Sequence, residues 1–258
     1  MLEELKVFSG TANPVLANSV CEYLNIPLGS AQIFKFSNDN TFVQYQENIR
    51  QQDIFLIQPF AFPVNDSIME LLIMVDAAKR ASAGRITIVI PYFSYGRTDK
   101  KDQPRVPITA RLIADLVTVA GADRVLTIDL HAGQIQGFFN IPVDELSALP
   151  LLSKYFIDKQ LSDAVVVAVD IGISKRARDM AERIGASLAI VEKRRVGNVE
   201  QTESLNVIGD VSGKVAITFD DETDTGGSLA SAVNALKNAG AREVFSCCTH
   251  GVFSGSGA

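Results

Sequence analysis

The chain has 258 residues, of which 47% are hydrophobic and 21% are charged, and its formal net charge is -6 at pH 7. This composition is typical of an ordinary globular protein that can bury a large core, and the negative charge argues against a nucleic-acid partner. The longest apolar stretches have the length of strands, so we expect no transmembrane helix and no membrane partner.

Short runs rich in β-branched residues alternate along the chain with segments of helical periodicity. In chain order, strands are expected at residues 53–59, 85–93, 124–130, 164–170, 187–193, 214–220 and 243–249. Helices, with apolar residues at i, i+3, i+4 and i+7, are expected at residues 67–81, 108–120, 174–184 and 228–239. The alternation predicts βαβ units around a mostly parallel sheet, and the uninterrupted apolar runs predict strands covered on both faces.

The alternating pattern occurs twice, which predicts two domains. The first extends over residues 1–149 and the second over residues 150–258, with the proline-containing stretch "IPVDELSALP" at the junction. We therefore expect an α/β fold of two domains, each a mostly parallel sheet flanked by helices. Ligands of such sheets bind beyond the carboxyl ends of the strands, so the residues that follow each strand are the candidates for function.

The stretch "VAITFDDETDTGGSLASAV", residues 215–233, lies at such a strand end. Gly226 and Gly227 let backbone N–H groups approach an anion closely, and Thr225 and Ser228 add hydroxyl donors. The helix that follows presents its N-terminus to the same anion. This combination predicts a phosphate-binding loop.

Three carboxylates in the same stretch, Asp220, Asp221 and Asp224, would repel a bare phosphate. Carboxylates accept hydrogen bonds from vicinal hydroxyls, so the stretch favours a ligand with both phosphate and hydroxyl groups, such as a sugar phosphate. The alternative is an acidic turn in which Asp224 or Thr225 only caps the helix.

Two other strand ends carry candidate residues. A loop after the strand at 85–93 holds five basic residues, namely Arg97, Lys100, Lys101, Arg105 and Arg111. A solvated charged face is the alternative interpretation of this loop. His131 follows the strand at 124–130 beside Asp129, and Asp170 ends another strand, so a metal role is credible; a structural histidine is the alternative.

The acidic and glycine-rich stretch resembles the phosphoribosyl-pyrophosphate binding motif of the phosphoribosyltransferase-type fold. With "KKDQPRVPITARLIADL" and "DLHAGQIQGFFNIPVD", the chain resembles the ribose-phosphate pyrophosphokinase (phosphoribosyl pyrophosphate synthetase) family, from "FSGTANPVLA" to "CTHGVFSG". The resemblance implies two phosphoribosyltransferase-like domains that face each other across the active site. It also implies Mg²⁺-dependent transfer of the β,γ-pyrophosphoryl group of ATP to the C1 hydroxyl of ribose 5-phosphate, giving phosphoribosyl pyrophosphate and AMP.

In the first domain, the resemblance assigns residues to ATP and to the metal ion. "FSNDN" matches the adenine loop, in which Phe36 would stack on the base and Asn38 would bond its edge. The full ATP set is Phe36, Asn38, Asp39, Asn40, Arg97, Thr98 and Asp99, and Arg97 would contact the phosphates. His131 and Asp170 would hold Mg²⁺ directly or through water.

In the second domain, the resemblance assigns the remaining ligand contacts. The pyrophosphate loop would be Asp170, Ile171, Gly172 and Ile173. "VEKRRVGN" matches the mobile catalytic loop, whose Lys193 and Arg195 would close over the developing charge. Ribose 5-phosphate would be bound by Arg195, Asp220, Asp221, Asp224, Thr225, Gly226, Gly227 and Ser228.

The sequence departs from the family pattern at ligand-binding positions. Thr98 replaces a usual Gln, Asn40 a usual Glu and Ile173 a usual Gly, while Glu222 and Thr223 stand where the family is usually apolar. Because β-branched residues disfavour positive φ, Ile173 is expected to disturb the pyrophosphate loop. The family normally continues past "THGVFSG", so the second domain is expected to be shortened at its C-terminus.

These departures leave two main hypotheses. The first is a working synthetase, favoured because Lys193, Arg195, His131, Asp170 and Asp220 are all present. The second is a catalytically weak regulatory relative that binds the ligands without efficient turnover. A phosphoribosyltransferase ranks last, because it shares only the ribose-phosphate loop.

Assembly and location follow partly from the family and partly from the residues. The resemblance implies homodimers that assemble into hexamers, with Asn140 replacing a usual Asp near subunit contacts, and it implies regulation by phosphate and ADP. The three cysteines fit a reducing compartment and form neither a disulfide framework nor a zinc pattern. With no signal peptide at the N-terminus, we expect a cytoplasmic protein.

Overall fold

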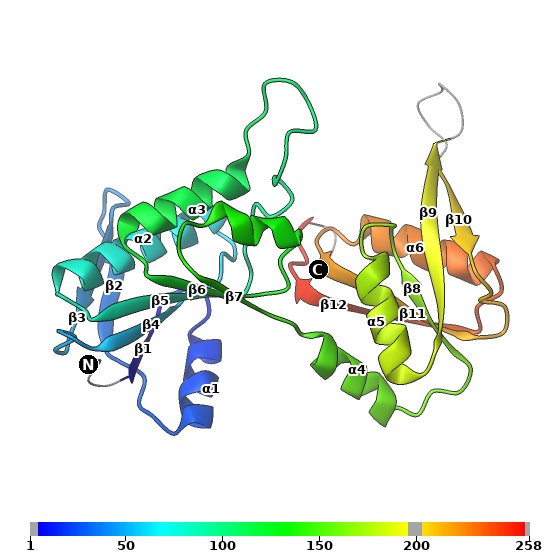
Figure 1. Cartoon of the computed structure of the whole chain (residues 1–258), viewed down its shortest axis with the longest axis horizontal. Coiled ribbons are helices and arrows are strands. Elements are labelled where there is room, and N and C mark those ends of the chain that lie inside the picture. Colours follow the sequence, from blue (N-terminus) through cyan, green and yellow to red (C-terminus); the bar gives the residue numbers. More distant parts are fainter. Residues whose placement is uncertain (1–4, 196–202, 256–258) are drawn as a thin grey trace. The chain divides into compact units, whose positions relative to one another are not determined.

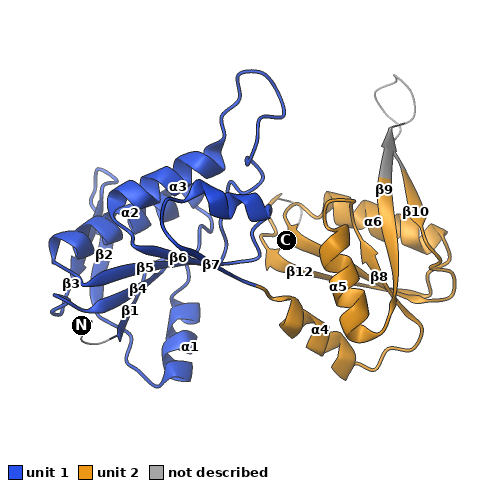
Figure 2. Ribbon diagram, viewed as in Figure 1, with its two compact units in different colours: residues 1–146 blue, residues 147–258 orange. Residues whose placement is uncertain are grey.

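The computed structural model describes residues 5–195 and 203–255, without the side chains of residues 193–195 and 203–204. The chain forms two compact units, residues 1–146 and residues 147–258 (Figure 2). In the described ranges, no helix is long and apolar enough to cross a membrane.

Unit 1 is built on a five-stranded sheet in which every neighbouring pair of strands is parallel (Figure 1). In sheet order, the strands are β1 (Leu5–Ser9), β4 (Asp53–Ile57), β5 (Arg85–Ile90), β6 (Arg124–Ile128) and β7 (Val143–Leu146). The helices are α1 (Pro14–Leu24), α2 (Val64–Arg80), α3 (Thr109–Ala120) and the 3-10 helix η1 (Gly133–Phe138).

Helices cover both faces of this sheet, because successive strand residues point to opposite sides. Phe8 and Leu56 belong to a buried cluster with residues of α2 and α3. Val7 and Ile57, the next residues along the same strands, pack with α1 in a separate cluster. This two-sided burial explains why the strands are apolar runs without alternation.

A separate antiparallel hairpin, β2 (Ala31–Lys35) and β3 (Thr41–Tyr45), packs against α2. Ile33, Val43 and Tyr45 join the core cluster, and the Tyr45 hydroxyl donates to the Met74 carbonyl at 2.8 Å. One face of the hairpin is therefore fixed to the helix. The opposite face, which carries Phe34 and Phe36, is exposed.

Unit 2 has a second five-stranded sheet, parallel except at one edge. In sheet order, the strands are β10 (Glu203–Ile208), β9 (Ser187–Arg195), β8 (Ala164–Ala168), β11 (Val215–Thr223) and β12 (Glu243–Gly251). Its helices are α4 (Leu149–Asp158), α5 (Ser174–Ile184) and α6 (Gly227–Asn238).

Strand β9 extends beyond its parallel neighbour. It pairs with β8 from Ser187 to Ile190 and with antiparallel β10 from Ile190 to Arg195. Among the described strands, residues 191–195 pair only with β10, and β9 with β10 forms a two-stranded arm (Figure 1).

The predicted α/β fold with mostly parallel sheets flanked by helices is confirmed. The helices expected at 108–120, 174–184 and 228–239 start or end within one residue of α3, α5 and α6. Several boundaries were wrong by two or three residues: the helix expected at 67–81 is α2, which begins at Val64, and the strands expected at 53–59, 85–93, 124–130 and 164–170 end earlier. The strand expected to end at Asp220 continues to Thr223, so Asp220 and Asp221 lie in β11.

Candidate functional site

The predicted phosphate loop of unit 2 joins β11 to α6. Gly226 caps the helix with φ of 76°, a left-handed conformation that glycine adopts without a steric penalty. Its carbonyl accepts the N–H of Ala230 at 2.8 Å, which closes the first turn. The N-cap residue is a glycine and has no side chain of its own to cap the helix. The N-terminus of α6 therefore directly follows the acidic strand end, and such a terminus attracts an anion.

The three carboxylates before this loop have different environments. Asp220 is partly buried, whereas Asp221 is only 7% exposed, so Asp220 is the more accessible of the two to a ligand. Burial, the hydrogen bond with the Asp221 side chain and the charge of that neighbour raise the pKa of Asp220 to about 8. Asp224 follows the strand and accepts a hydrogen bond from the Ser254 hydroxyl.

The predicted pyrophosphate loop lies between β8 and α5. Asp170, Ile171 and Gly172 are exposed, and Asp170 Oδ1 accepts the N–H of Ile173 at 3.0 Å. Ile173 does not adopt the positive φ that a branched residue disfavours. Ile173 has an ordinary φ of −85°, and its side chain is buried in the unit 2 core. The branched side chain packs inward, away from any ligand at the exposed residues.

The two candidate catalytic residues, Lys193 and Arg195, lie on strand β9, opposite Leu205 and Glu203 of β10. Their side chains fall outside the described part of the chain, as do residues 196–202 of the predicted mobile loop. The backbone places both residues on the two-stranded arm.

In unit 1, the loop after β5 presents Arg97, which is exposed. The neighbouring Thr98 forms a turn: its N–H and its hydroxyl both donate to the carbonyl of Tyr95, at 2.9 and 2.7 Å. The Thr98 carbonyl accepts the N–H of Ala110 in α3 at 3.3 Å. The threonine at this position therefore uses its short hydroxyl to fix the loop.

The same loop is joined to the loop after β6, which carries His131. Asp99 is only 7% exposed, and its Oδ2 accepts a hydrogen bond from Gln134 Nε2 at 2.6 Å. His131 itself is exposed. Sequence reasoning missed Gln134. The available signal was that Asp99 and Gln134 follow neighbouring strands, β5 and β6, of one parallel sheet.

The predicted adenine loop connects β2 and β3, and Phe36, Asn38, Asp39 and Asn40 are all exposed there. The Phe36 ring contacts Phe34 and Phe42 edge to face, with centroids 5.0 and 5.8 Å apart. Lys35 pairs with Asp39 at 2.8 Å and with Asp66 of α2 at 2.7 Å. These contacts tie the hairpin tip to the helix and present a supported aromatic ring.

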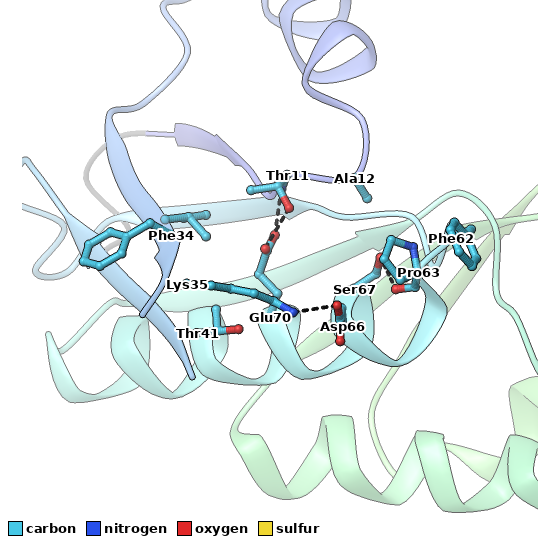
Figure 3. Close-up of a pocket in the computed structure, with 11 residues that line it drawn as sticks. Thr11, Ala12, Phe34, Lys35, Thr41, Phe62, Pro63, Asp66, Ser67 and Glu70 are labelled. Carbon is cyan, nitrogen blue, oxygen red and sulfur yellow. Dashed lines mark hydrogen bonds and ion pairs between the residues drawn. The ribbon is translucent and has the colours of Figure 1, made fainter. Parts of the chain in front are cut away.

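Behind this hairpin lies a pocket of about 330 Å³, lined in part by Thr11, Lys35, Asp66 and Glu70 (Figure 3). Glu70 accepts hydrogen bonds from Thr11 N–H and Thr11 Oγ1, at 2.6 and 2.8 Å, and from buried Gln58 at 2.8 Å. None of the predicted ATP-binding residues lines this pocket. Its polar groups fix the loop after β1 to α2.

The surroundings of His131 and Asp170 determine whether these residues fit a Mg²⁺ ion. Within the described ranges, no group of three or more His, Cys, Asp or Glu residues could hold a metal ion. Mg²⁺ commonly retains several waters and uses one or two carboxylates together with substrate phosphates. Asp170 is exposed and uses only Oδ1 to hold its own loop, so a carboxylate oxygen remains for such an ion. His131 and Asp170 belong to different units.

Two family models match the chain. Residues 5–121 match the N-terminal domain of ribose phosphate pyrophosphokinase, and residues 196–258 match the phosphoribosyl synthetase-associated domain.

Similar proteins extend this match over nearly the whole chain. The ribose-phosphate pyrophosphokinases of Clostridium perfringens and Thermotoga maritima are each 52% identical, over 98% and 97% of this chain and 80% of their own lengths. The crystal structure of phosphoribosylpyrophosphate synthetase from Mycobacterium smegmatis superposes with a TM-score of 0.90 at 43% identity, covering 98% of this chain and 83% of that one.

Proposed function

This chain belongs to the ribose-phosphate pyrophosphokinase family, and from that premise we propose the reaction and the residues that carry it. The chain is a transferase that moves the β,γ-pyrophosphoryl group of ATP to the C1 hydroxyl of ribose 5-phosphate. The hydroxyl oxygen forms a bond to the β-phosphorus, and the bond from that phosphorus to the oxygen shared with the α-phosphate breaks. AMP leaves with the shared oxygen, the hydroxyl proton is released, and phosphoribosyl pyrophosphate is the product.

One observation carries the sugar-phosphate half of the proposal. The carboxyl end of β11, with Asp220, is followed directly by the glycine-capped N-terminus of α6. Backbone N–H groups at the helix start bind the 5-phosphate, while the carboxyl groups of Asp220 and its acidic neighbours form hydrogen bonds with ribose hydroxyls. A ligand with a phosphate at one end and vicinal hydroxyls at the other satisfies both groups.

The nucleotide half of the proposal rests on unit 1. Phe36 stacks on the adenine ring and Asn38 bonds the base edge, while Arg97 contacts the phosphates. Arg97 suits this role because it is exposed on a loop whose neighbours are fixed by hydrogen bonds. A preorganised cation stabilises transferring phosphoryl groups without reorganisation during the reaction.

We also propose that Mg²⁺ serves the reaction, held by His131 and Asp170 directly or through water. When bound, this ion neutralises phosphate charge and orients the transferring group. Lys193 and Arg195 close over the same charge from the arm of β9 and β10. Assembly of copies of this chain into dimers and hexamers in the cytoplasm, with regulation by phosphate and ADP, belongs to the same proposal.

The first experiment measures AMP and phosphoribosyl pyrophosphate formation from ATP, Mg²⁺ and ribose 5-phosphate. Lys193→Ala is expected to lower turnover by about two orders of magnitude or more while leaving ribose 5-phosphate binding nearly intact, because its charge acts in the transition state. Equal losses of binding and turnover would contradict the role of Lys193. A folded wild-type chain that binds ATP but forms no product would instead identify the ligand-binding regulatory relative.

A further inference from the structure

We propose that Gln134 is a positioning residue for nucleotide binding, because its amide holds the loop that carries Arg97 against the loop that carries His131. We call the hydrogen bond from Gln134 to Asp99 the Asp99–Gln134 clasp. The inference rests on the proposed function, since it concerns how the ATP loops of unit 1 are held in place.

The Asp99 carboxylate is buried and depends on Gln134 for its side-chain hydrogen bond. Asp99 is 7% exposed, and the described structure records one side-chain hydrogen bond to it, the 2.6 Å bond from Gln134. A buried carboxylate without a donor is strongly unfavourable, so loss of the Gln134 amide would drive Asp99 toward solvent. Such a movement displaces the loop, because Asp99 lies two residues after Arg97.

The backbone that carries Gln134 is anchored in the core of unit 1. It lies in η1, and the next residue, Ile135, is fully buried in the unit 1 core. The N–H of Ile135 donates to the Ala132 carbonyl at 3.0 Å. The Gln134 amide is therefore presented from a fixed backbone, and the Arg97 loop is the part that must adapt to it.

A second junction joins the same two loops on the other side of Arg97. Gly96 is buried, and a Cβ atom placed there would lie 3.2 Å from the Cβ of His131. Gly96 thus lies close against the His131 loop and Asp99 is hydrogen-bonded to it, while Arg97 between them is exposed. Fixing both ends of so short a segment restricts the directions in which the guanidinium can point.

The chemistry of the clasp suits a phosphate-binding loop. A carboxylate two residues from Arg97 would repel the triphosphate if it were exposed. The Gln134 amide keeps that carboxylate buried and hydrogen-bonded without adding a charge of its own. Asp99 therefore acts as an anchor for the loop, and Arg97 makes the phosphate contact.

The test compares four proteins by calorimetric ATP binding and by steady-state kinetics: wild type, Gln134→Glu, the double variant Asp99→Asn with Gln134→Glu, and Gln136→Glu. Gln134→Glu sets two carboxylates against each other. The double variant restores an amide–carboxylate hydrogen bond with the partners exchanged and no change in side-chain length. Gln136→Glu makes the same change two residues along η1, where the side chain pairs with Glu145 of β7 instead.

We expect Gln134→Glu to weaken ATP binding and raise the KM for ATP about tenfold or more, with the KM for ribose 5-phosphate changed less than about twofold. The double variant should recover most of the loss, and Gln136→Glu should bind ATP within about twofold of wild type. Unchanged ATP binding in Gln134→Glu would overturn the proposal. So would parallel losses for both substrates, or a double variant no better than the single one. Calorimetry tests the clasp even if the wild type forms no product, which separates its failure from failure of the proposed function.

Discussion

At the level of single residues, the fold changes the protonation of Asp220. Its pKa is raised to about 8 by burial and by the Asp221 carboxyl, so the folded chain keeps a proton that the unfolded chain loses near pH 4. Because the unfolded state binds fewer protons in this window, this group lowers the free energy of unfolding as the pH rises from about 4 to about 8.

Replacing this carboxyl with an amide should remove that part of the pH dependence. We expect the free energy of unfolding of Asp220→Asn to gain on that of wild type steadily between pH 5 and pH 8, measured by urea titration. Asp102→Asn, at an exposed position of unit 1, removes the same charge as a control. Parallel pH profiles for wild type and Asp220→Asn would contradict the burial argument.

Phe36 gives a second prediction at this scale. Its ring is half exposed and is held edge to face by Phe34 and Phe42. An aromatic pair contributes about 0.5–1.5 kcal/mol, so Phe42→Leu should weaken ATP binding by about two- to tenfold by disordering the stacking ring. Tyr23→Leu, at an aromatic residue 90% exposed on α1, is the matched control and should bind ATP like wild type. Equal affinities in all three proteins would show that the ring needs no support.

At the level of elements, the N-terminus of α6 depends on one backbone conformation. Gly226→Ala places a Cβ on a residue with φ of 76°, which costs about 1 kcal/mol, and shifts the N–H groups proposed to bind phosphate. Gly185→Ala is a matched control, because Gly185 has φ of 69° in the C-cap of α5 with open space around a Cβ. Both variants should lose similar stability in thermal unfolding, but only Gly226→Ala should lose ribose 5-phosphate affinity. Loss of affinity in both would point to a general effect of destabilisation.

The sequence predicted most strands of the two sheets, but it missed β1, β7, β10, the hairpin of β2 and β3, and the helices α1 and α4. Strands β5, β8 and β11 each contain an uninterrupted run of five apolar or β-branched residues, which is a clear signal of a buried strand. The hairpin of β2 and β3 mixes polar and apolar residues, because only one of its faces packs on α2, and β10 carries polar residues at the sheet edge. Short, one-sided strands give a weaker hydrophobic signal than buried ones.

Some features of the candidate site could likewise be predicted from local sequence signals, and others could not. The position of the Gly226 loop between β11 and α6 could be predicted, because strand ends and glycine positions are local signals in the sequence. The Asp99–Gln134 clasp and the inward packing of Ile173 could not, because they depend on which side chains the tertiary structure brings together. Thr98 is intermediate: the residue departs from the family pattern, and only the structure reveals its hydroxyl bond to Tyr95.

At the level of the whole molecule, the proposed ATP loops belong to unit 1 and the ribose 5-phosphate loop to unit 2. A substitution in one unit should therefore weaken the binding of one ligand only. Turnover needs both ligands, so it should fall after a substitution in either unit. Arg97→Ala should weaken ATP binding by about tenfold and leave ribose 5-phosphate affinity unchanged, and Gly226→Ala should do the reverse, as measured by calorimetry. Turnover should fall in both variants. An Arg97→Ala variant that loses both affinities would place the two ligands on one unit.

The arm formed by β9 and β10 has a mechanical consequence. Residues 191–195 extend past the last contact with β8, a length of about 16 Å at about 3.3 Å per strand residue. The core holds most of this ribbon, because Val191 is buried and Leu205 and Val207 of β10 pack against the core of unit 2. Leu205 pairs with Lys193, so only two residue pairs, about 7 Å of ribbon, lie beyond the packed part. The fold of unit 2 therefore acts as a rigid mount for the backbone of Lys193, and Arg195 lies one short step further out on the same strand.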